Sequence, residues 1–369
     1  MRVTSENELA EAIRDARGPL RIRGGGTRPV GRPVAGELLD VSGLDGVVMY
    51  EPEALTIVVR AGLALSALEG MLAAENQRLA FEPADWRLLM DSQGEPTVGG
   101  MVAANVSGPR RVQAGACRDA ILGVRFVDGT GQIVKNGGRV MKNVTGYDLA
   151  RLVAGSWGTL GVITEIAFKT LPAPDLAATI IVDVHGATAA VAAMSAALSS
   201  PYDVTGAAYV PGEGVMIRVE GFEKSVAYRA GRLEALLGRH GEVRTEIDPV
   251  EVAGLWDRVA RVAPLADLGG EIWRISTRPS AAPDLVARLA GDYMLDWGGG
   301  LIWAVLPEGE DARERLGRFD GHATLIRASE QTRSRIPPFQ PQPEPIARIE
   351  RALRAKFDPR GILNPGVMD

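Results

Sequence analysis

A run of three glycines, Gly24–Gly26, limits what this chain can fold into more than any other feature. The run follows a short apolar segment, residues 20–23, which predicts a strand. In a Rossmann fold or a P-loop, such glycines open directly into a helix whose N-terminus meets the phosphate. Here Pro29, Gly31 and Pro33 follow instead, and prolines break a helix. The sequence therefore predicts neither of these two folds.

The remaining interpretation of the glycine run is a compact turn. Successive exposed N–H groups in such a turn form a concavity that binds anions, and Arg23 and Arg28 flank it. Glycine suits this role because a phosphate can approach the backbone without meeting a Cβ. A tight turn without any ligand is the alternative that the loop alone leaves open.

Charge and cysteine content exclude several classes of function. The chain has 369 residues, with 41 Lys+Arg against 46 Asp+Glu, so it has no basic patch of the kind that binds nucleic acid. Its one cysteine, Cys117, excludes an intramolecular disulfide, a Cys-ligated zinc site and an iron–sulfur cluster held by this chain. No signal-peptide pattern or long apolar run is present, so we expect a cytoplasmic protein. Peripheral contact with the inner face of the membrane remains open.

Proline-rich segments divide the chain. Two prolines at 171–174 and the Pro-rich stretch 337–343 indicate boundaries after residues 172 and 336. In the first part we expect helices at 4–17 and 63–79, strands at 20–23, 38–41 and 55–59, and several short strands in the glycine-dense stretch 94–161. In the middle part we expect strands at 178–184, 204–210, 214–220 and 242–247, helices at 187–199 and 223–239, and a second strand–helix–strand stretch at 271–329. A basic helix at 344–356 follows, and no internal repeat is evident.

Four internal segments share an unusual content of small residues. They are 96–108 (Pro-Thr-Val-Gly-Gly-Met-Val-Ala-Ala-Asn-Val-Ser-Gly), 115–119, 142–149 (Lys-Asn-Val-Thr-Gly-Tyr-Asp-Leu) and 155–165 (Gly-Ser-Trp-Gly-Thr-Leu-Gly-Val-Ile-Thr-Glu). A segment of small residues lets a flat ring lie against the backbone. With the glycine loop and the ending 357–366, these segments resemble, in the same order, the FAD-binding (PCMH-type) flavoproteins that include vanillyl-alcohol oxidase, D-lactate dehydrogenase and glycolate oxidase.

The resemblance implies an α+β fold. It consists of a PCMH-type FAD-binding domain of two α+β subdomains (1–172), a ferredoxin-like α+β cap (173–336) and a C-terminal segment (337–369) that packs back on the FAD domain. It also implies the cofactor ligands by position. The pyrophosphate would lie on the loop of Arg23, Gly24, Gly25, Gly26, Thr27 and Arg28. The pyrophosphate and the flavin would lie along Thr97, Gly99, Gly100, Ala103, Asn105, Ser107 and Gly108. The adenine would be enclosed by Gly158, Thr159, Gly161 and Val162, and the isoalloxazine ring would lie near Asn364.

The same resemblance implies that FAD is bound without a covalent link. Some relatives attach the flavin to a histidine just after the glycine loop, but the only histidines here are His185, His240 and His322. Cys117 matches no pattern for thiol attachment, and we expect it to be buried in packing.

The family's metal motif, His-x-Gly-Asp-Gly-Asn-x-His, is absent, since only Asp320-Gly321-His322-Ala323-Thr324 stands in the later part of the chain. No metal site is therefore predicted, and the family's usual base is missing with the motif. The cap is also short. In both respects the chain resembles the smaller FAD-domain subunit of the bacterial three-part glycolate oxidase. This implies a larger FAD-containing subunit and an iron–sulfur subunit as partners, with a small 2-hydroxy acid as substrate.

Three residues are candidates for the chemistry. Arg274 could bind the substrate carboxylate or a partner, since arginine pairs with carboxylates bidentately, and the neighbouring Trp273 could cover the flavin. Lys142 and Tyr147 are further candidates near flavin or substrate. Each also has a purely structural interpretation, and His322 alone is more typical of a surface residue. A stand-alone FAD oxidase of hydroxy acids or alcohols and a non-catalytic FAD-stabilised scaffold remain as alternatives to a catalytic subunit.

Overall fold

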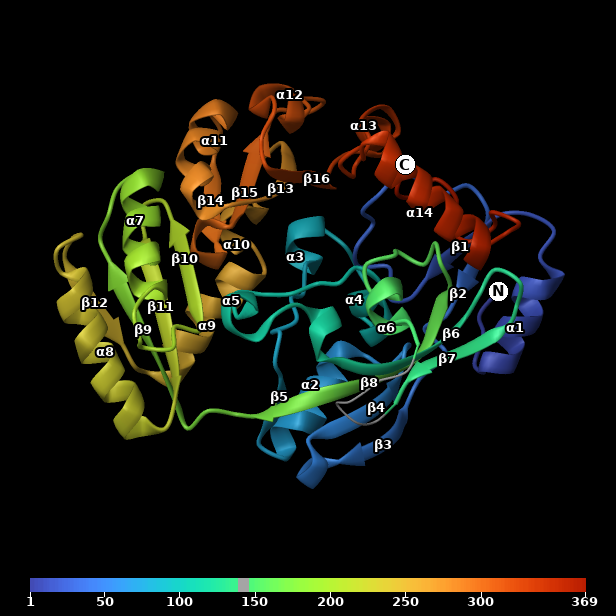
Figure 1. Ribbon diagram of the computed structural model, residues 1–369, viewed down its shortest axis with the longest axis horizontal. Helices are drawn as coiled ribbons and strands as arrows, with labels where there is room; N and C mark the ends of the chain where they lie inside the picture. The colour runs from blue at the N-terminus through green and yellow to red at the C-terminus, as the bar shows by residue number, and fades with distance from the viewer. Residues whose placement is uncertain (139–145) are drawn as a thin grey trace.

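The computed structural model describes residues 1–138 and 146–369, and its strands fall into separate sheets on either side of residue 172. Strand β8 (Val162–Pro172) belongs to the sheet of the N-terminal lobe (residues 1–172), and β9 (Leu176–Val182) begins the sheet of the cap (residues 173–336). Figure 1 shows these two lobes side by side, with the C-terminal segment returning to the first lobe.

The N-terminal lobe contains two sheets. A parallel pair, β1 (Leu20–Arg23) and β2 (Glu37–Asp40), packs with α1 (Glu6–Asp15) around Leu9, Ile13 and Leu39. Beside it lies an antiparallel sheet in the order β3-β4-β8-β6-β7, and β5 also pairs with β8. The bounds are β3 (Val47–Glu51), β4 (Thr56–Arg60), β5 (Gln77–Leu79), β6 (Ile121–Val127) and β7 (Ile133–Gly137).

The cap is built from the same β-α-β-β-α-β unit used twice. The first unit is β9, α7 (Ala187–Leu198), β10 (Gly206–Val210), β11 (Gly214–Gly221), α8 (Glu223–Leu237) and β12 (Val243–Glu246), and the second is β13 (Glu271–Thr277), α11 (Ala282–Leu289), β14 (Tyr293–Asp296), β15 (Leu301–Leu306), α12 (Ala312–Leu316) and β16 (Gly321–Arg327). All eight strands form one sheet in the order β12-β9-β11-β10-β14-β15-β13-β16, so the second unit repeats the first in mirrored strand order. The ferredoxin-like prediction is confirmed. The expectation of no repeat is wrong at the level of topology, because the duplication is of fold and leaves no visible sequence period.

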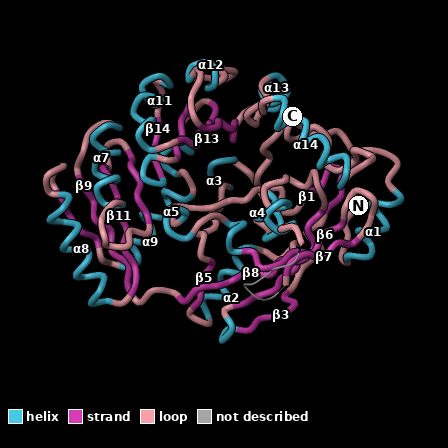
Figure 2. The backbone as a smooth tube through the Cα atoms, viewed as in Figure 1, coloured by secondary structure: helices cyan, strands magenta, loops and turns pink. Residues whose placement is uncertain are grey.

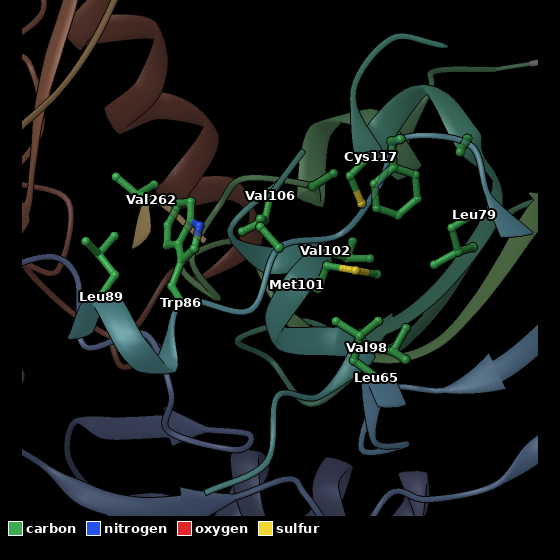
Figure 3. Packing of buried hydrophobic residues seen from close by; sticks show 14 of the residues in the cluster. Leu65, Leu79, Trp86, Leu89, Val98, Met101, Val102, Val106, Cys117 and Val262 are labelled. Carbon is green, nitrogen blue, oxygen red and sulfur yellow. The ribbon is translucent and has the colours of Figure 1, made fainter. Parts of the chain in front are cut away.

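The two faces of the cap sheet pack against different partners. Helices α7, α8, α11 and α12 cover one face, as Figure 2 shows for α7, α8 and α11, and this face forms its own core. The other face shares a core with the N-terminal lobe, through Ile272, Met294 and Trp303. Figure 3 shows this junction, where Trp86 lies beside Leu89 and Val262, a cap residue. The face that each strand residue presents therefore decides whether it can reach the N-terminal lobe.

Residues 273 and 274 point to opposite faces of β13, because side chains alternate along a strand. Trp273 is fully buried in the core beneath the cap helices, where the Arg313 guanidinium lies 5.1 Å from its ring. The suggestion that Trp273 covers the flavin is therefore wrong. Arg274 lies on the face toward the N-terminal lobe.

Several predicted elements differ from the structure. The helix expected at 63–79 ends at Ala74 of α2 (Leu65–Ala74), because Asn76 adopts a left-handed conformation (φ 52°) and residues 77–79 join β8 as β5. In the stretch 94–161, strands occur only as β6 and β7 among the described residues, whereas 98–103 form a short helix, α4 (Val98–Ala103), capped by Thr97. Helix α9 (Pro249–Ala260), capped by Asp248, was not predicted.

The C-terminal segment returns to the first lobe. After α14 (Glu344–Phe357), the Leu20 N–H donates to the Ile362 carbonyl at 2.7 Å, and the Asn364 N–H donates to the Leu20 carbonyl at 3.0 Å. The segment thus extends the β1–β2 pair beside the glycine loop. Among the described residues, no helix is long and apolar enough to cross a membrane.

Candidate functional site

A cavity of about 350 Å³ lies where the glycine loop, α4, the segment 157–163 and the C-terminal segment meet. Helix α13 (Glu330–Arg335), at the end of the cap, adds Glu330 and Arg333 to the wall. Most of the residues predicted to bind the cofactor line this cavity: Arg23, Gly24, Gly25, Gly26, Thr27, Arg28, Thr97, Gly99, Gly100, Ala103, Gly158, Gly161, Val162 and Asn364. The folded chain thus brings together segments that are more than 300 residues apart in sequence.

The glycine loop is held so close to its neighbours that side chains would not fit. A Cβ on Gly25 would lie 1.7 Å from the Glu95 carbonyl oxygen, and one on Gly24 would lie 2.5 Å from Thr97 Oγ1. The N–H groups of residues 24–27 make no hydrogen bond to another described residue. Because backbone N–H groups are nearly always paired, such a row at the wall of a cavity fits the oxygens of a diphosphate.

Three guanidinium groups add positive charge to the same cavity. The Nε atoms of Arg28, Arg32 and Arg333 are buried and have no hydrogen-bond acceptor in the described part of the chain. Burial lowers the pKa of Arg28 to about 10, so its guanidinium stays charged at neutral pH. Arg333 holds the loop by donating from Nη1 to the carbonyls of Pro29 (2.7 Å) and Gly31 (2.9 Å). These unpaired donors complement an anionic cofactor. No sequence signal singled out Arg32 or Arg333.

Asn364 forms the floor of the cavity by bridging two walls. Its Oδ1 accepts from the Ile22 N–H at 2.8 Å, and its Nδ2 donates to the Trp157 carbonyl at 2.9 Å. A Cβ on Gly158 would lie 3.0 Å from Asn364 Nδ2, so these two residues are in contact. The resemblance implied that Gly158 lies beside the adenine and Asn364 beside the isoalloxazine ring, and both residues line the same cavity.

Four predicted ligands are not among the residues that line this cavity. Asn105 Oδ1 accepts from the Arg118 N–H (3.1 Å), Ser107 Oγ accepts from the Cys117 N–H (2.9 Å), and Thr159 Oγ1 donates to the Ser156 carbonyl (2.7 Å). A Cβ on Gly108 would lie 2.5 Å from the Glu82 carbonyl. These residues brace the segments that carry the lining residues, and Cys117 is buried in packing as predicted.

Comparison with known proteins agrees with this geometry. Residues 1–137 match the family model described as FAD binding domain. The chain is 37% identical over 365 residues, 98% of its own length and 95% of the relative's, to glycolate oxidase subunit GlcE of Escherichia coli (strain K12). The chain belongs to the FAD-binding flavoprotein family that includes this subunit.

Further relatives agree with this flavoprotein assignment. D-lactate dehydrogenase of Anaerostipes hadrus is 34% identical over 187 residues, 48% of this chain and 37% of that protein. The solved structure of an alkyldihydroxyacetonephosphate synthase superposes with a TM-score of 0.67 at 18% identity, over 99% of this chain and 76% of the other, which supports the fold alone. The predictions of the family, the α+β fold class, FAD as cofactor and an FAD-dependent oxidoreductase are confirmed.

Two of the three candidate catalytic residues of this flavoprotein are described by the structure, and their surroundings differ. Lys142 lies outside the described residues. Tyr147 precedes α6 (Leu149–Val153) and is 87% exposed, and its carbonyl accepts hydrogen bonds from Asn136 Nδ2 at 3.0 Å and from the Leu149 N–H at 3.1 Å. It does not line the cavity. Arg274 is half-buried between the lobes. Unlike Tyr147, it lies among charged and aromatic side chains of both lobes.

A chain of arginine and tryptophan side chains leads from the cavity to Arg274. The Arg28 guanidinium lies 5.6 Å from the Trp86 ring centre, and Trp86 meets Trp303 edge to face at 5.5 Å. The Arg274 guanidinium lies 5.9 Å from the Trp303 ring and 5.0 Å from that of Trp297. Cation–π and edge-to-face contacts of this kind join the cavity wall to the cap through packed side chains.

Proposed function

We propose that this flavoprotein is the FAD-carrying subunit of a glycolate oxidase complex and takes part in oxidising glycolate to glyoxylate. The observation that carries the proposal is the near full-length relationship to a glycolate oxidase subunit, together with a cavity whose unpaired donors suit FAD. A bound flavin accepts the hydride that the alcohol carbon of a hydroxy acid gives up.

The residues of this chain would hold and orient the cofactor. The free N–H groups of residues 24–27, with Arg32 and Arg333, bind the diphosphate, and Asn364 supports the wall. The binding is non-covalent. His185, His240 and His322 do not line the cavity, and burial raises the pKa of the Cys117 thiol so strongly that it stays protonated and unreactive.

Partners would complete the reaction. We infer a larger FAD-containing subunit and an iron–sulfur subunit, because one cysteine cannot hold a cluster here and the electrons need a route out of the flavin. The family's histidine motif for proton transfer is missing from this chain, so we expect the larger subunit to supply that base. Arg274 would bind the carboxylate of the substrate.

The test is reduction of the flavin by glycolate. Visible flavin absorbance is followed after glycolate is added to the purified chain, and again after the larger subunit is added. We expect bleaching of this chain's flavin only in the assembled complex. Bleaching of the chain alone would support a stand-alone oxidase. A flavin of this chain that is never reduced in the complex would support a non-catalytic scaffold.

A further inference from the structure

Two arginines from different lobes share the ring of Trp297. The Arg274 guanidinium on β13 lies 5.0 Å from the ring centre, and the guanidinium of Arg111, the first residue of α5 (Arg111–Ala114) in the N-terminal lobe, lies 4.7 Å from it. The indole N–H of Trp297 donates to the Gly108 carbonyl at 3.1 Å, which ties the ring to the lobe that carries Arg111. Two positive charges, one from each lobe, therefore contact the same ring at the boundary between the lobes, and beyond the effect of burial, Arg111 is close enough to lower the pKa of Arg274.

Neither charge is neutralised by this chain as described. The two guanidinium groups make no hydrogen bond and no ion pair with another described residue, although both are half-buried. Burial lowers the pKa of Arg274 to about 10, and repulsion from Arg111 adds to this effect. Burial and Arg118 lower the pKa of Arg111 in the same way. Both remain charged at neutral pH, so their repulsion persists until an anion arrives.

The nearest ionisable groups offset these charges only in part. Against the effect of burial, Asp119 raises the pKa of Arg111, but its carboxylate forms an ion pair with Arg151 at 3.6 Å. Asp296 is buried, and its Oδ1 accepts from the Trp297 N–H at 2.7 Å. Burial raises the pKa of Asp296 to about 7, and repulsion from Glu82 opposes ionisation further, so its negative charge is weakened at neutral pH. Burial and the two arginines lower the pKa of His322, which is therefore neutral and adds no charge of its own. The cluster keeps a net positive charge.

We propose that Arg111 and Arg274 together form a binding site for a small carboxylate, with the Trp297 ring as its apolar wall. Planar guanidinium groups bind carboxylates through paired N–H donors, and two of them suit a compact acid such as glycolate or oxalate. This inference rests on the proposed function, whose substrate the site would hold. It adds Arg111, from the N-terminal lobe, so the site exists only when the two lobes are packed together.

The site can be tested without turnover. Oxalate resembles glycolate in size and charge type but has no hydrogen on carbon to transfer. It is titrated into the FAD-loaded chain while the tryptophan emission and the melting temperature are recorded. We expect a saturable change in emission and a rise in melting temperature, because a ligand that binds only the folded state stabilises it. Arg111→Gln and Arg274→Gln should each weaken the affinity at least tenfold.

Two controls make the result specific. Arg232→Gln removes an exposed arginine of α8 and should leave oxalate binding unchanged. Without oxalate, the two site variants should melt close to the wild type. Each relieves a repulsion and breaks no hydrogen bond to a described residue, which offsets the lost cation–π contact with Trp297. The proposal is overturned if oxalate does not bind saturably, or if both site variants bind it as tightly as the wild type. The same holds if the site takes only an acidic side chain of a partner, because oxalate would then not bind.

The outcome is separable from that of the proposed function. If oxalate binds through Arg111 and Arg274 but glycolate never reduces this chain's flavin in the complex, the carboxylate site stands and the glycolate role fails. If the flavin bleaches normally in both variants and oxalate does not bind, the site fails and the role stands.

Discussion

Arg218 and Arg274 lie on the same face of the cap sheet, one in each half of the duplicated fold, yet their surroundings are opposite. Each guanidinium faces a tryptophan ring, Trp256 at 4.4 Å for Arg218 and Trp297 at 5.0 Å for Arg274. Arg218 also makes two parallel hydrogen bonds to the Glu82 carboxylate, at 2.7 and 2.9 Å. Arg274 has no such partner among the described residues.

The Arg218 side of the boundary is a compensated ion network. The Glu220 carboxylate, on β11 beside Arg218, forms ion pairs with Arg110 Nη2 at 2.6 Å and Arg78 Nη1 at 2.8 Å. Both arginines come from the N-terminal lobe. Burial raises the pKa of Glu82, but the attraction of Arg218 and Arg110 outweighs it, so this pKa lies below its usual value. Charges from both lobes thus satisfy one another.

The same residue type thus lies in two different electrostatic environments at one interface. Where carboxylates from the other lobe reach the arginine, the pair fixes the two lobes together. Where the carboxyl that acts on the arginine, Asp296, is buried and has a raised pKa, the charge of Arg274 is offset only in part. Variants of both arginines and of their carboxyl neighbours distinguish the two situations.

Removing Arg218 should have the largest effect. Arg218→Met leaves the Glu82 carboxylate without its main partner, and breaking a buried pair in this way typically costs about 3–5 kcal/mol. The free energy of unfolding in urea measures the loss. The double variant Arg218→Met, Glu82→Gln should recover part of it, because no unpaired charge remains. A loss below about 1 kcal/mol in the single variant would show that the network does not hold the lobes together.

Acid should weaken the same network. Burial alone would raise the pKa of Glu220, but Arg218, Arg110 and Arg78 lower it to about 2. A lowered pKa stabilises the fold above the unfolded value of about 4.5, and this stability is lost as the pH falls toward 2. The gap in unfolding free energy between wild type and Glu220→Gln should therefore shrink by about 3 kcal/mol between pH 6 and pH 2. Glu223→Gln, at an exposed glutamate, should show no such change.

Asp296 should show the opposite dependence on pH. Its raised pKa of about 7 means that stability present below pH 4 is lost as the pH rises through 7. Asp296→Asn removes that loss, although Arg218 and Arg274 also lose a partial counter-charge. We expect the variant to be more stable than the wild type by about 1–2 kcal/mol at pH 8, with no gain at about pH 3, below the usual pKa of an aspartate of about 3.9. The exposed Asp292→Asn is the matched control, and a variant that is less stable at pH 8 would refute the assignment.

Arg274→Gln should have the smallest effect on stability. Since the guanidinium makes no hydrogen bond to a described residue and is repelled by Arg111, we expect an unfolding free energy within about 1 kcal/mol of wild type. Thermal and urea unfolding of the two proteins side by side measure this. A decrease in unfolding free energy as large as that of Arg218→Met would show that Arg274 stabilises the fold as much as Arg218 does.

Local sequence patterns were sufficient for much of the fold and of the cofactor site. Pro29 and Pro33 after the glycine run excluded a Rossmann helix, and the ordered small-residue segments predicted most residues of the cavity wall. The helices predicted at 223–239 and 344–356 correspond closely to α8 and α14. Two predictions failed for local reasons. The helix predicted at 63–79 ends early because Asn76 is left-handed. The suggestion that Trp273 covers the flavin ignored the alternation along β13, which points Trp273 and Arg274 to opposite faces.

The fold family, the glycine loop and the lack of a cysteine set for an iron–sulfur cluster followed from residue identities alone. Contacts between distant segments were needed to show that Arg333 lines the cavity from a helix some 300 residues away, that the cap is a duplicated unit, and that Arg111 and Arg274 contact one ring. The physical reason is that burial and charge pairing are properties of contacts between distant segments. Arg218 and Arg274 look alike in the sequence, and only the carboxylates that the other lobe brings to them tell them apart.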